Sequence, residues 1–398
     1  MDIIITPSKL KGTVPAIPSK SQAHRVLICS AFSDQPTTIF CPESSQDIEA
    51  TVACLSQLGA NIQRLPDGYH IKPIVSPPKS AHLFCKDCGA TLRFLLPIVG
   101  ALGVSATFHL EGNLSNRPLS PLWELLEHHG CKLKRPEKNT VSICGKLIPG
   151  DYTLAGNVSS QFSTGLLLAF SLLDGTSSLT LTGNVESKPY IQMTQHVMFC
   201  FGVESADLKV HGKGKFTTPG KWIVEGDWSN AAFYLASNAL GNCVSVEHLN
   251  QQSVQGDRQI LDCLKRLNEP FTVSASNIPD LIPILSVVAA YHCGAVFTDI
   301  ARLRLKESDR VESIISMLHS FGCRAEVDDS RIIVHPGIFR GCTIDSFGDH
   351  RIAMAAAIAA TAADGPVTIL NAHCVQKSYP NFWETYRALG GNYEQLSW

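Results

Sequence analysis

LSQLGANIQRLPDGYHIKP, at residues 55–73, shows the unit from which the rest of this chain is built. Its apolar residues recur at helical spacing up to Gly59, and an alternation typical of strands follows. Gly59 occupies the position just past the helix, where a left-handed backbone costs least without a side chain. The stretch therefore predicts a helix that ends at a glycine and leads into short strands.

The same junction recurs along the chain. Further examples are LLEHHGCKLKRPEKNTVSICG at 125–145, VMFCFGVESADLKVHG at 197–212 and MLHSFGCRAEVDDSRIIVHPG at 317–337. In LKRLNEPFTVSA, at 264–275, an Asn stands in the place of the glycine, and Asn is the next-best residue for that conformation. The six expected helix ends are Gly59, Gly130, Gly202, Asn268, Gly322 and Gly390. Their roughly even spacing predicts six small α/β blocks, which we group as three per domain.

Length and composition set the class of protein. The chain has 398 residues, more than one ordinary hydrophobic core needs, so two domains are expected. Its 33 basic and 35 acidic residues give a net charge of −2, which argues against nucleic acid or an anionic membrane as partner. The N-terminus shows no signal peptide, and the apolar runs are too short or too interrupted to span a bilayer. We expect a soluble, cytoplasmic protein.

The cysteines favour the same compartment. There are 14 of them, scattered along the chain, and only Cys85 and Cys88 form a CxxC pair, with His82 nearby. No second pair stands at zinc-site spacing. Buried, reduced thiols are therefore a better interpretation than a metal or redox site.

Short polar clusters precede several apolar helical patterns. A helix N-terminus favours anions, and Lys, Arg and Ser placed there form a phosphate or carboxylate pocket. Serine also caps helices, so Ser159 alone fits either role equally well. Arg25 could still be an ordinary solvated side chain. The clusters are SKSQAHR (19–25), DCGATLR (87–93), NVSSQFS (157–163), NIPD (277–280), RLRLKESDR (302–310), GDHR (348–351) and QKSYP (376–380).

Common motifs of other enzyme classes are absent from the sequence. It contains no GxxxxGK[ST], no GxGxxG that opens a strand–helix unit, no GxSxG and no HExxH. Nucleotide-dependent phosphoryl transfer through a P-loop, hydrolysis by a nucleophile elbow and zinc proteolysis are therefore disfavoured.

The clusters SKSQAHR, VSSQF, ESKPY, LRLKESDR, GDHRIAMA and CVQKSYP, in this order from Pro7 to Pro380, resemble 5-enolpyruvylshikimate-3-phosphate synthase. The resemblance implies an α/β (α+β) fold of two domains, each of three βαβαββ units in an inside-out barrel, with the active site in the interdomain cleft. One domain would comprise 1–18 and 225–398, with phosphoenolpyruvate-side and acid/base residues. The inserted domain, 19–224, would hold shikimate-3-phosphate, and the chain would cross back near Ile223–Asp227.

The resemblance also implies a reaction. That family transfers the enolpyruvyl group of phosphoenolpyruvate to the 5-hydroxyl of shikimate-3-phosphate, through a tetrahedral intermediate and without a metal or organic cofactor. It serves aromatic amino acid biosynthesis. We expect these two small molecules as the only partners, no nucleic acid or membrane, a monomer, and domain closure on binding.

Site residues are carried over position by position. Asp280 matches the base that takes the 5-hydroxyl proton, and Lys306 and Glu307 match acid/base groups near the reacting carbons. Lys20, Lys306 and Glu307 remain open as the residue that protonates the methylene carbon. Contacts to shikimate-3-phosphate are implied for Lys20, Ser21, Arg25, Ser159, Ser160, Gln161, Ser187, Asp280 and Lys306. Contacts to phosphoenolpyruvate are implied for Lys20, Gly89, Arg93, Arg117, Gln161, Arg310, Arg351 and Lys377.

Some positions depart from the family pattern. Cys88 and Ala90 are unusual in the DCGAT stretch, Phe94 replaces a proline of some members, and Arg302 stands where some members place a substrate-contacting Asn. These changes concern phosphoenolpyruvate affinity and the response to competing analogues. The nearest alternative is UDP-N-acetylglucosamine enolpyruvyl transferase, but that family has Lys-Asn where this chain has Lys20 followed by Ser21.

Overall fold

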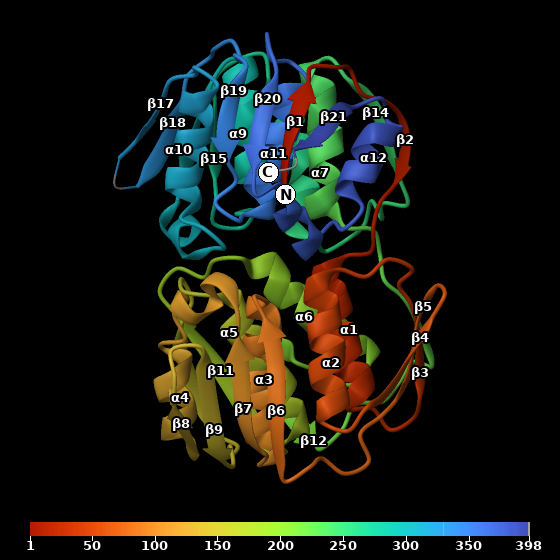
Figure 1. The fold of residues 1–398 in the computed structure, drawn as a ribbon. Coiled ribbons are helices and arrows are strands. Elements are labelled where there is room, and N and C mark those ends of the chain that lie inside the picture. Colours follow the sequence, from red (N-terminus) through yellow and green to blue (C-terminus); the bar gives the residue numbers. More distant parts are fainter. Residues whose placement is uncertain (329, 397–398) are drawn as a thin grey trace. The chain divides into compact units, whose positions relative to one another are not determined.

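The structure is a computed structural model that describes residues 1–328 and 330–396 (Figure 1). The chain divides into two compact units: Met1–Ile17 with Gly226–Trp398, and Pro18–Glu225. We call them the composite unit and the inserted unit.

Three sheets form the outer layer of the inserted unit among the described residues, in the strand orders β6-β7-β9-β8, β13-β3-β5-β4 and β10-β11-β12. In the first, β6 and β7 are parallel, whereas β9 runs antiparallel to both β7 and β8. The strands are β3 Thr37–Phe40, β4 Asn61–Leu65, β5 Gly68–Lys72, β6 Ser80–Lys86, β7 Ser105–Leu110, β8 Cys131–Lys134, β9 Thr140–Gly145, β10 Asp151–Ala155, β11 Asp174–Thr182, β12 Lys209–Lys213 and β13 Lys221–Ile223.

Helices fill the interior of this unit. Helices α3 and α5 pack against each other, and α5 also contacts α6. Nearly every residue of α3 and α5 is buried, so both helices are apolar on almost all sides rather than amphipathic. The helices are α1 Lys20–Ala31, α2 Gln46–Gln57, α3 Gly89–Leu102, α4 Leu122–His128, α5 Ser160–Leu172 and α6 Lys188–Cys200, with 3₁₀ turns η1 Gly112–Asn116 and η2 Ala206–Leu208.

The described part of the composite unit also has three sheets, in the orders β19-β20-β1-β21, β15-β16-β18-β17 and β14-β2. The N-terminal strand β1 lies between β20 and β21 and is antiparallel to both, which ties the beginning of the chain to its end. The strands are β1 Asp2–Thr6, β2 Lys11–Pro15, β14 Cys243–Glu247, β15 Phe271–Ser274, β16 Ala295–Thr298, β17 Ala325–Val327, β18 Arg331–Val334, β19 Cys342–Asp345, β20 Val367–Leu370 and β21 Asn392–Leu396.

Buried helices again form the core of the composite unit. Helices α7, α9 and α11 contact one another, and all residues of α11 are buried. The helices are α7 Trp228–Ser237, α8 Ile260–Cys263, α9 Ile282–Tyr291, α10 Arg310–Ser320, α11 His350–Ala360 and α12 Phe382–Ala388. The 3₁₀ turns are η3 Asn238–Leu240, η4 Gly256–Gln259, η5 Leu264–Arg266, η6 Ala301–Leu305 and η7 Ala372–Lys377.

Two of the sheets join segments that are distant in sequence. Strand β2 pairs in parallel with β14, and β3 pairs in parallel with β13. Strands β2 and β14 lie before and after the insertion, whereas β3 and β13 lie near the start and near the end of the insertion. The expected α/β fold of repeated blocks is confirmed, and these two strand pairings show how segments on either side of a crossing between the units complete a sheet.

The expected helix ends are confirmed at the glycines and wrong at Asn268. Gly59, Gly130, Gly202, Gly322 and Gly390 have φ values of 108°, 100°, 75°, 84° and 93°. Asn268 is not among the described residues with positive φ. The chain leaves α8 through the 3₁₀ turn η5, which needs no left-handed residue to end it. Among the described residues, no helix combines the length and the apolar character needed to cross a membrane.

Candidate active site

Helix starts of the inserted unit carry the polar clusters that the sequence predicted. Ser19 caps α1 by accepting from the backbone N–H of Gln22, and Cys88 caps α3 in the same way through its sulfur. Ser159 caps α5 by accepting from the N–H of Gln161 at 3.3 Å. Capping, one of the two roles considered for Ser159, is therefore present in the structure. The other backbone N–H groups in the first turn of each helix point out of its N-terminal end.

Arg25 is a buried cation whose hydrogen-bond acceptors are all neutral. Its guanidinium donates to Thr194 Oγ1 at 2.8 Å, to Thr164 Oγ1 at 3.1 Å, and to the carbonyl oxygens of Ser21 and Tyr190 at 2.6 and 3.0 Å. Burial lowers the pKa of Arg25 to about 10. The solvated side chain that the sequence left open for Arg25 is thus wrong. A buried positive charge without a carboxylate partner favours the arrival of an anion.

Lys20, the first residue of α1, forms an ion pair inside the same unit. Its Nζ lies 2.7 Å from Oδ2 of Asp47, in the first turn of α2, and the Lys20 side chain is 17% exposed. A lysine at a helix start opposes the helix dipole. The carboxylate of Asp47 offsets this cost and holds the ammonium group in place. Asp47 was not predicted as a site residue, because an acidic residue in a first turn is ordinary helix chemistry.

Two arginines surround Gly89, the first residue of α3. A Cβ at Gly89 would lie 3.0 Å from Nη1 of Arg117 and 3.3 Å from Nη1 of Arg93. Arg93 donates to Gln161 Oε1 at 2.8 Å and to the carbonyl oxygen of Pro118 at 3.0 Å. Arg93 and Arg117 are both buried. A side chain at Gly89 would therefore be in tight contact with both guanidinium groups, and glycine leaves room for them.

Three serines of this unit occupy helix starts. Ser160 is the first residue of α5, and Ser187 precedes α6, where its backbone has a φ of 55°. All of Ser159, Ser160 and Ser187 are buried. The left-handed backbone of Ser187 costs free energy for a residue other than glycine, and such strain gathers at functional sites.

Arg310 organises the site residues of the composite unit. This first residue of α10 is 1% exposed and donates to three carboxylates. Its Nη1 lies 2.6 Å from Oδ1 of Asp280, its Nη2 lies 3.0 Å from Oε2 of Glu307, and its Nε lies 2.8 Å from Oδ2 of Asp349. Burial alone would lower the pKa of Arg310, but the three carboxylates raise it above its ordinary value.

Asp280 lies two residues before α9 and faces three cations. Besides Arg310, Lys306 Nζ lies 3.4 Å from Oδ1 of Asp280 and Arg351 Nη2 lies 3.6 Å from Oδ2. Burial alone would raise the pKa of Asp280, but Lys306, Arg351 and Arg310 together hold it well below the usual range. The carboxylate is thus ionised, as a base must be, although the three cations weaken its basicity.

Lys306 and Glu307 are adjacent between η6 and α10, and both contact the same ionic cluster. Burial lowers the pKa of Lys306 to about 8, with Asp280 acting in the opposite direction. A pKa near 8 suits a group that gives up or takes a proton near neutrality. The structure therefore brings Asp280, Lys306, Glu307, Arg310 and Arg351 together in one ionic cluster.

Asp349 is a residue of this cluster that the sequence prediction missed. It is fully buried, pairs with Arg310 and caps α11 by accepting from the N–H of Arg351 at 2.9 Å. One carboxylate thus fixes two arginines. The GDHR motif contains Asp349, but a capping Asp is common enough that only its contact with Arg310 reveals the second role.

Asp257 was also missed, because QGDR follows no helical pattern in the sequence. It is buried, accepts from the hydroxyl of Ser229, and has an oxygen, Oδ1, without a hydrogen-bond partner. Burial raises the pKa of Asp257 to about 7, and the charge of Asp280 acts in the same direction. The carbonyl oxygen of Ser229 in turn accepts from Arg351 Nη1 at 2.8 Å.

Lys377 lies at the end of a 3₁₀ turn and not at the start of a helix. The QKSYP cluster was predicted as a helix start, but Lys377 is the last residue of η7, and α12 begins only at Phe382. Residues 378–381 separate the two, and Pro380 restricts the residue before it to extended backbone. Lys377 is nevertheless buried.

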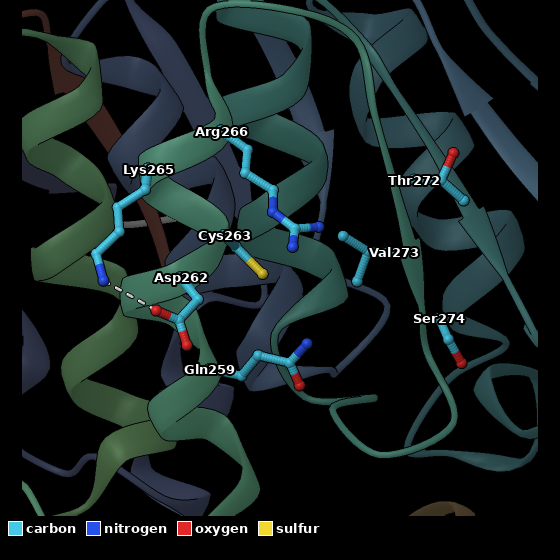
Figure 2. Close-up of a pocket in the computed structure, with 8 residues that line it drawn as sticks. All are labelled: Gln259, Asp262, Cys263, Lys265, Arg266, Thr272, Val273 and Ser274. Carbon is cyan, nitrogen blue, oxygen red and sulfur yellow. Dashed lines mark hydrogen bonds and ion pairs between the residues drawn. The ribbon is translucent and has the colours of Figure 1, made fainter.

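A separate pocket of about 470 Å³ lies beside α8, η5 and β15 (Figure 2). None of the predicted site residues lines it. Lys265 pairs with Asp262 across one turn at 2.9 Å, and Arg266 extends toward Val273. Both residues of the ion pair are highly exposed, so this pocket has the character of an ordinary solvated surface.

Comparison with known proteins identifies one family over most of the chain. The family model described as EPSP synthase (3-phosphoshikimate 1-carboxyvinyltransferase) matches residues 4–386. The chain is 37% identical to the 3-phosphoshikimate 1-carboxyvinyltransferase of Clostridium acetobutylicum, over 99% of this chain and 98% of that protein. It is also 37% identical to the enzyme of that name from Clostridium kluyveri, over 99% of each.

Solved structures agree in fold. The EPSP synthase of Acinetobacter baumannii superposes with a TM-score of 0.79 at 24% sequence identity, over 99% of each chain. At this identity the likeness supports the fold, while the family rests on the relatives in sequence.

Proposed function

We propose which residues of the inserted and the composite unit carry out the reaction of EPSP (5-enolpyruvylshikimate-3-phosphate) synthase, the family to which this chain belongs. The chain transfers the enolpyruvyl group of phosphoenolpyruvate to the 5-hydroxyl of shikimate-3-phosphate and releases phosphate. This step lies in aromatic amino acid biosynthesis. The roles of individual residues below are our proposal.

Arg25 is the observation that carries the assignment of the acceptor. A buried guanidinium with only neutral partners is stabilised by a phosphorylated acceptor more than by an uncharged one. Ser21 accepts through its carbonyl oxygen from the same guanidinium. We propose that shikimate-3-phosphate is held by Lys20, Ser21, Arg25, Ser159, Ser160, Gln161 and Ser187 of the inserted unit, with Asp280 and Lys306 of the composite unit.

Phosphoenolpyruvate would be held by arginines from both units. Arg93 and Arg117 face Gly89, and a guanidinium can bind a carboxylate or phosphate through two hydrogen bonds. The side-chain oxygen of Gln161 accepts a hydrogen bond from Arg93, so the Gln161 amide group lies beside this arginine. Lys20, Arg310, Arg351 and Lys377 complete the proposed set.

Asp280 is proposed as the base for the 5-hydroxyl. The pKa of Asp280 is low because three cations face it. Bound anionic substrates would partly neutralise the positive charge of these cations. Binding would therefore raise the pKa of Asp280 and make it a stronger base when a proton must be removed.

Lys306, Glu307 and Lys20 remain as candidates for protonating the methylene carbon. Protonation creates positive character on the adjacent carbon, which the hydroxyl then attacks. The carboxylate of Glu307, oriented by Arg310 at 3.0 Å, would stabilise that positive charge. Phosphate then leaves, with its negative charge offset by the arginines.

The acceptor is tested by phosphate release from phosphoenolpyruvate with shikimate-3-phosphate or UDP-N-acetylglucosamine. We expect turnover with shikimate-3-phosphate alone. Turnover only with the sugar nucleotide would identify the rival transferase, and turnover with neither would reject the proposal.

The residues proposed for each substrate come from both units, so we also propose that the units close on binding. Small-angle scattering should give a smaller radius of gyration with both substrates than without them. Identical curves would contradict closure without affecting the reaction.

A further inference from the structure

Three side chains of metal-binding type meet among the helix starts of the inserted unit. His24 lies in the second turn of α1, Asp47 is in the first turn of α2, and Cys88 caps α3. All three are buried, and one ligand atom from each lies within 4.8 Å of the other two. The distance between Cys88 Sγ and His24 Nε2 is 3.9 Å.

This set of atoms fits a thiophilic cation. Thiolate sulfur, imidazole nitrogen and carboxylate oxygen are the ligands of tetrahedral zinc sites, with bond lengths of about 2.0 to 2.3 Å. Two ligands at tetrahedral angles around such an ion stand about 3.3 to 3.8 Å apart, close to the 3.9 Å between Cys88 Sγ and His24 Nε2. The first two turns of α1 and α2 and the N-cap of α3 supply these three ligands.

Two threonine hydroxyl groups hold the histidine ring in place. His24 Nδ1 lies 2.7 Å from Oγ1 of Thr51, and that hydroxyl lies 2.7 Å from Oγ1 of Thr91. If Nδ1 carries the proton that Thr51 accepts, the lone pair of Nε2 faces Cys88. Metal-binding histidines are commonly fixed in this way through their other nitrogen.

Lys20 competes with a cation for Asp47. Its Nζ lies 2.7 Å from Asp47 Oδ2, and its side chain is 17% exposed, whereas the three ligands are less exposed. A cation that enters from this side would displace the ammonium group from the carboxylate. A residue proposed to contact both substrates would then lose its position.

We propose that His24, Asp47 and Cys88 bind one thiophilic divalent cation, of the class of Zn²⁺ or Cd²⁺, and that this binding inhibits the transferase. The Cys88 S–H bond breaks, its proton passes to solvent, and a metal–sulfur bond forms. Inhibition rests on the role proposed for Lys20, whereas binding itself does not.

Cadmium titration of the reduced full-length chain tests the binding. Thiolate coordination gives a charge-transfer absorbance in the ultraviolet, and wild-type protein should develop it with one equivalent of Cd²⁺. Cys88→Ser should lose this absorbance and bind Cd²⁺ at least tenfold more weakly. Serine is itself a good N-cap, so α3 keeps its cap in this variant.

Two further variants separate this site from the other thiols. Cys144 is exposed and lies outside the cluster, so Cys144→Ser should titrate as wild type does. His24→Asn should weaken Cd²⁺ binding at least tenfold and leave the thiols intact. Equal Cd²⁺ absorbance in wild type and Cys88→Ser, or its loss in Cys144→Ser, would overturn the proposed site.

Inhibition has its own readout. The Zn²⁺ concentration for half-inhibition, measured relative to each protein's metal-free rate, should rise at least tenfold in Cys88→Ser and stay unchanged in Cys144→Ser. Metal binding without inhibition would overturn the coupling to Lys20. A chain with no transferase activity at all would instead reject the proposed function, and the cadmium titration would still decide the site.

Discussion

Arg25 and Arg310 are buried arginines in the first two turns of a helix, one in each unit, yet their surroundings are opposite. Arg25 donates only to hydroxyl and carbonyl oxygens, whereas Arg310 donates to Asp280, Glu307 and Asp349. The charge of Arg25 is therefore available to a ligand, and that of Arg310 is largely balanced by the protein. The same residue type is proposed to bind an anion in the inserted unit, whereas in the composite unit it holds three carboxylates together.

We expect the largest difference between Arg25 and Arg310 in how much each contributes to the free energy of unfolding. Arg310→Met leaves three carboxylates without their shared cation, so we expect a loss of about 3 to 5 kcal/mol in the free energy of unfolding. Arg25→Met removes an unbalanced charge, and Thr164 and Thr194 keep a hydrogen bond to each other at 2.8 Å. We expect that variant to change stability by less than about 1 kcal/mol.

Urea unfolding followed by circular dichroism and by fluorescence measures both variants under the same conditions. Each serves as the control for the other, because the substitution and the degree of burial are matched. Equal losses of stability would contradict the distinction between the two arginines.

Asp280→Asn tests the catalytic side of the comparison. The amide cannot accept the 5-hydroxyl proton, so we expect kcat to fall about a hundredfold or more. The control is Asp262→Asn, since Asp262 is exposed and pairs with Lys265 at the surface. Steady-state phosphate release measures both, and near-normal turnover in Asp280→Asn would reject its role as base.

Arg351→Ala tests an arginine that has both a carboxylate and a neutral oxygen as partners. Arg351 lies 3.6 Å from Asp280 and donates to a carbonyl oxygen, while its Nε has no partner. We expect chiefly a higher KM for phosphoenolpyruvate, by about tenfold, because a ligand contact is lost. Arg331→Ala, at an exposed ion pair with Asp328, should leave KM unchanged. An unchanged KM in Arg351→Ala would remove it from the phosphoenolpyruvate site.

The smallest effect concerns pH. Lys306 has a pKa of about 8, so its charged form is lost as pH rises through that value. If the charged form is required, kcat/KM falls on the alkaline side, by about fourfold at pH 8.5, because kcat/KM reports the free enzyme. Lys306→Arg keeps its charge and should lack this decline. Profiles of the same shape in both proteins would show that Lys306 does not produce it.

Much of the site could be predicted because it lies at local features. Lys20, Gly89, Ser160, Arg310 and Arg351 each stand at a helix start that an apolar pattern and a capping residue mark in the sequence. Helix boundaries of this kind depend on neighbouring residues, so reading them needs no knowledge of the tertiary fold.

Other parts of the site could not be predicted in this way. Asp349 looks like an ordinary cap until Arg310, 39 residues earlier, is found beside it. Asp257 stands in no helical pattern, and its contact with Ser229 and the nearby charge of Arg351 link it to the cluster only in the tertiary structure. Asn268 was wrongly predicted as left-handed, because the short helix α8 ends in a 3₁₀ turn instead.

The sequence by itself determined the six-block α/β plan, the helix starts and the cations and serines on them. These properties follow from the periodicity of apolar residues and from local backbone preferences. The tertiary structure alone decided which charges are balanced, since that depends on contacts between residues distant in the chain. It gave Arg310 three carboxylates, left Arg25 with neutral oxygens, and placed Cys88 beside His24 and Asp47.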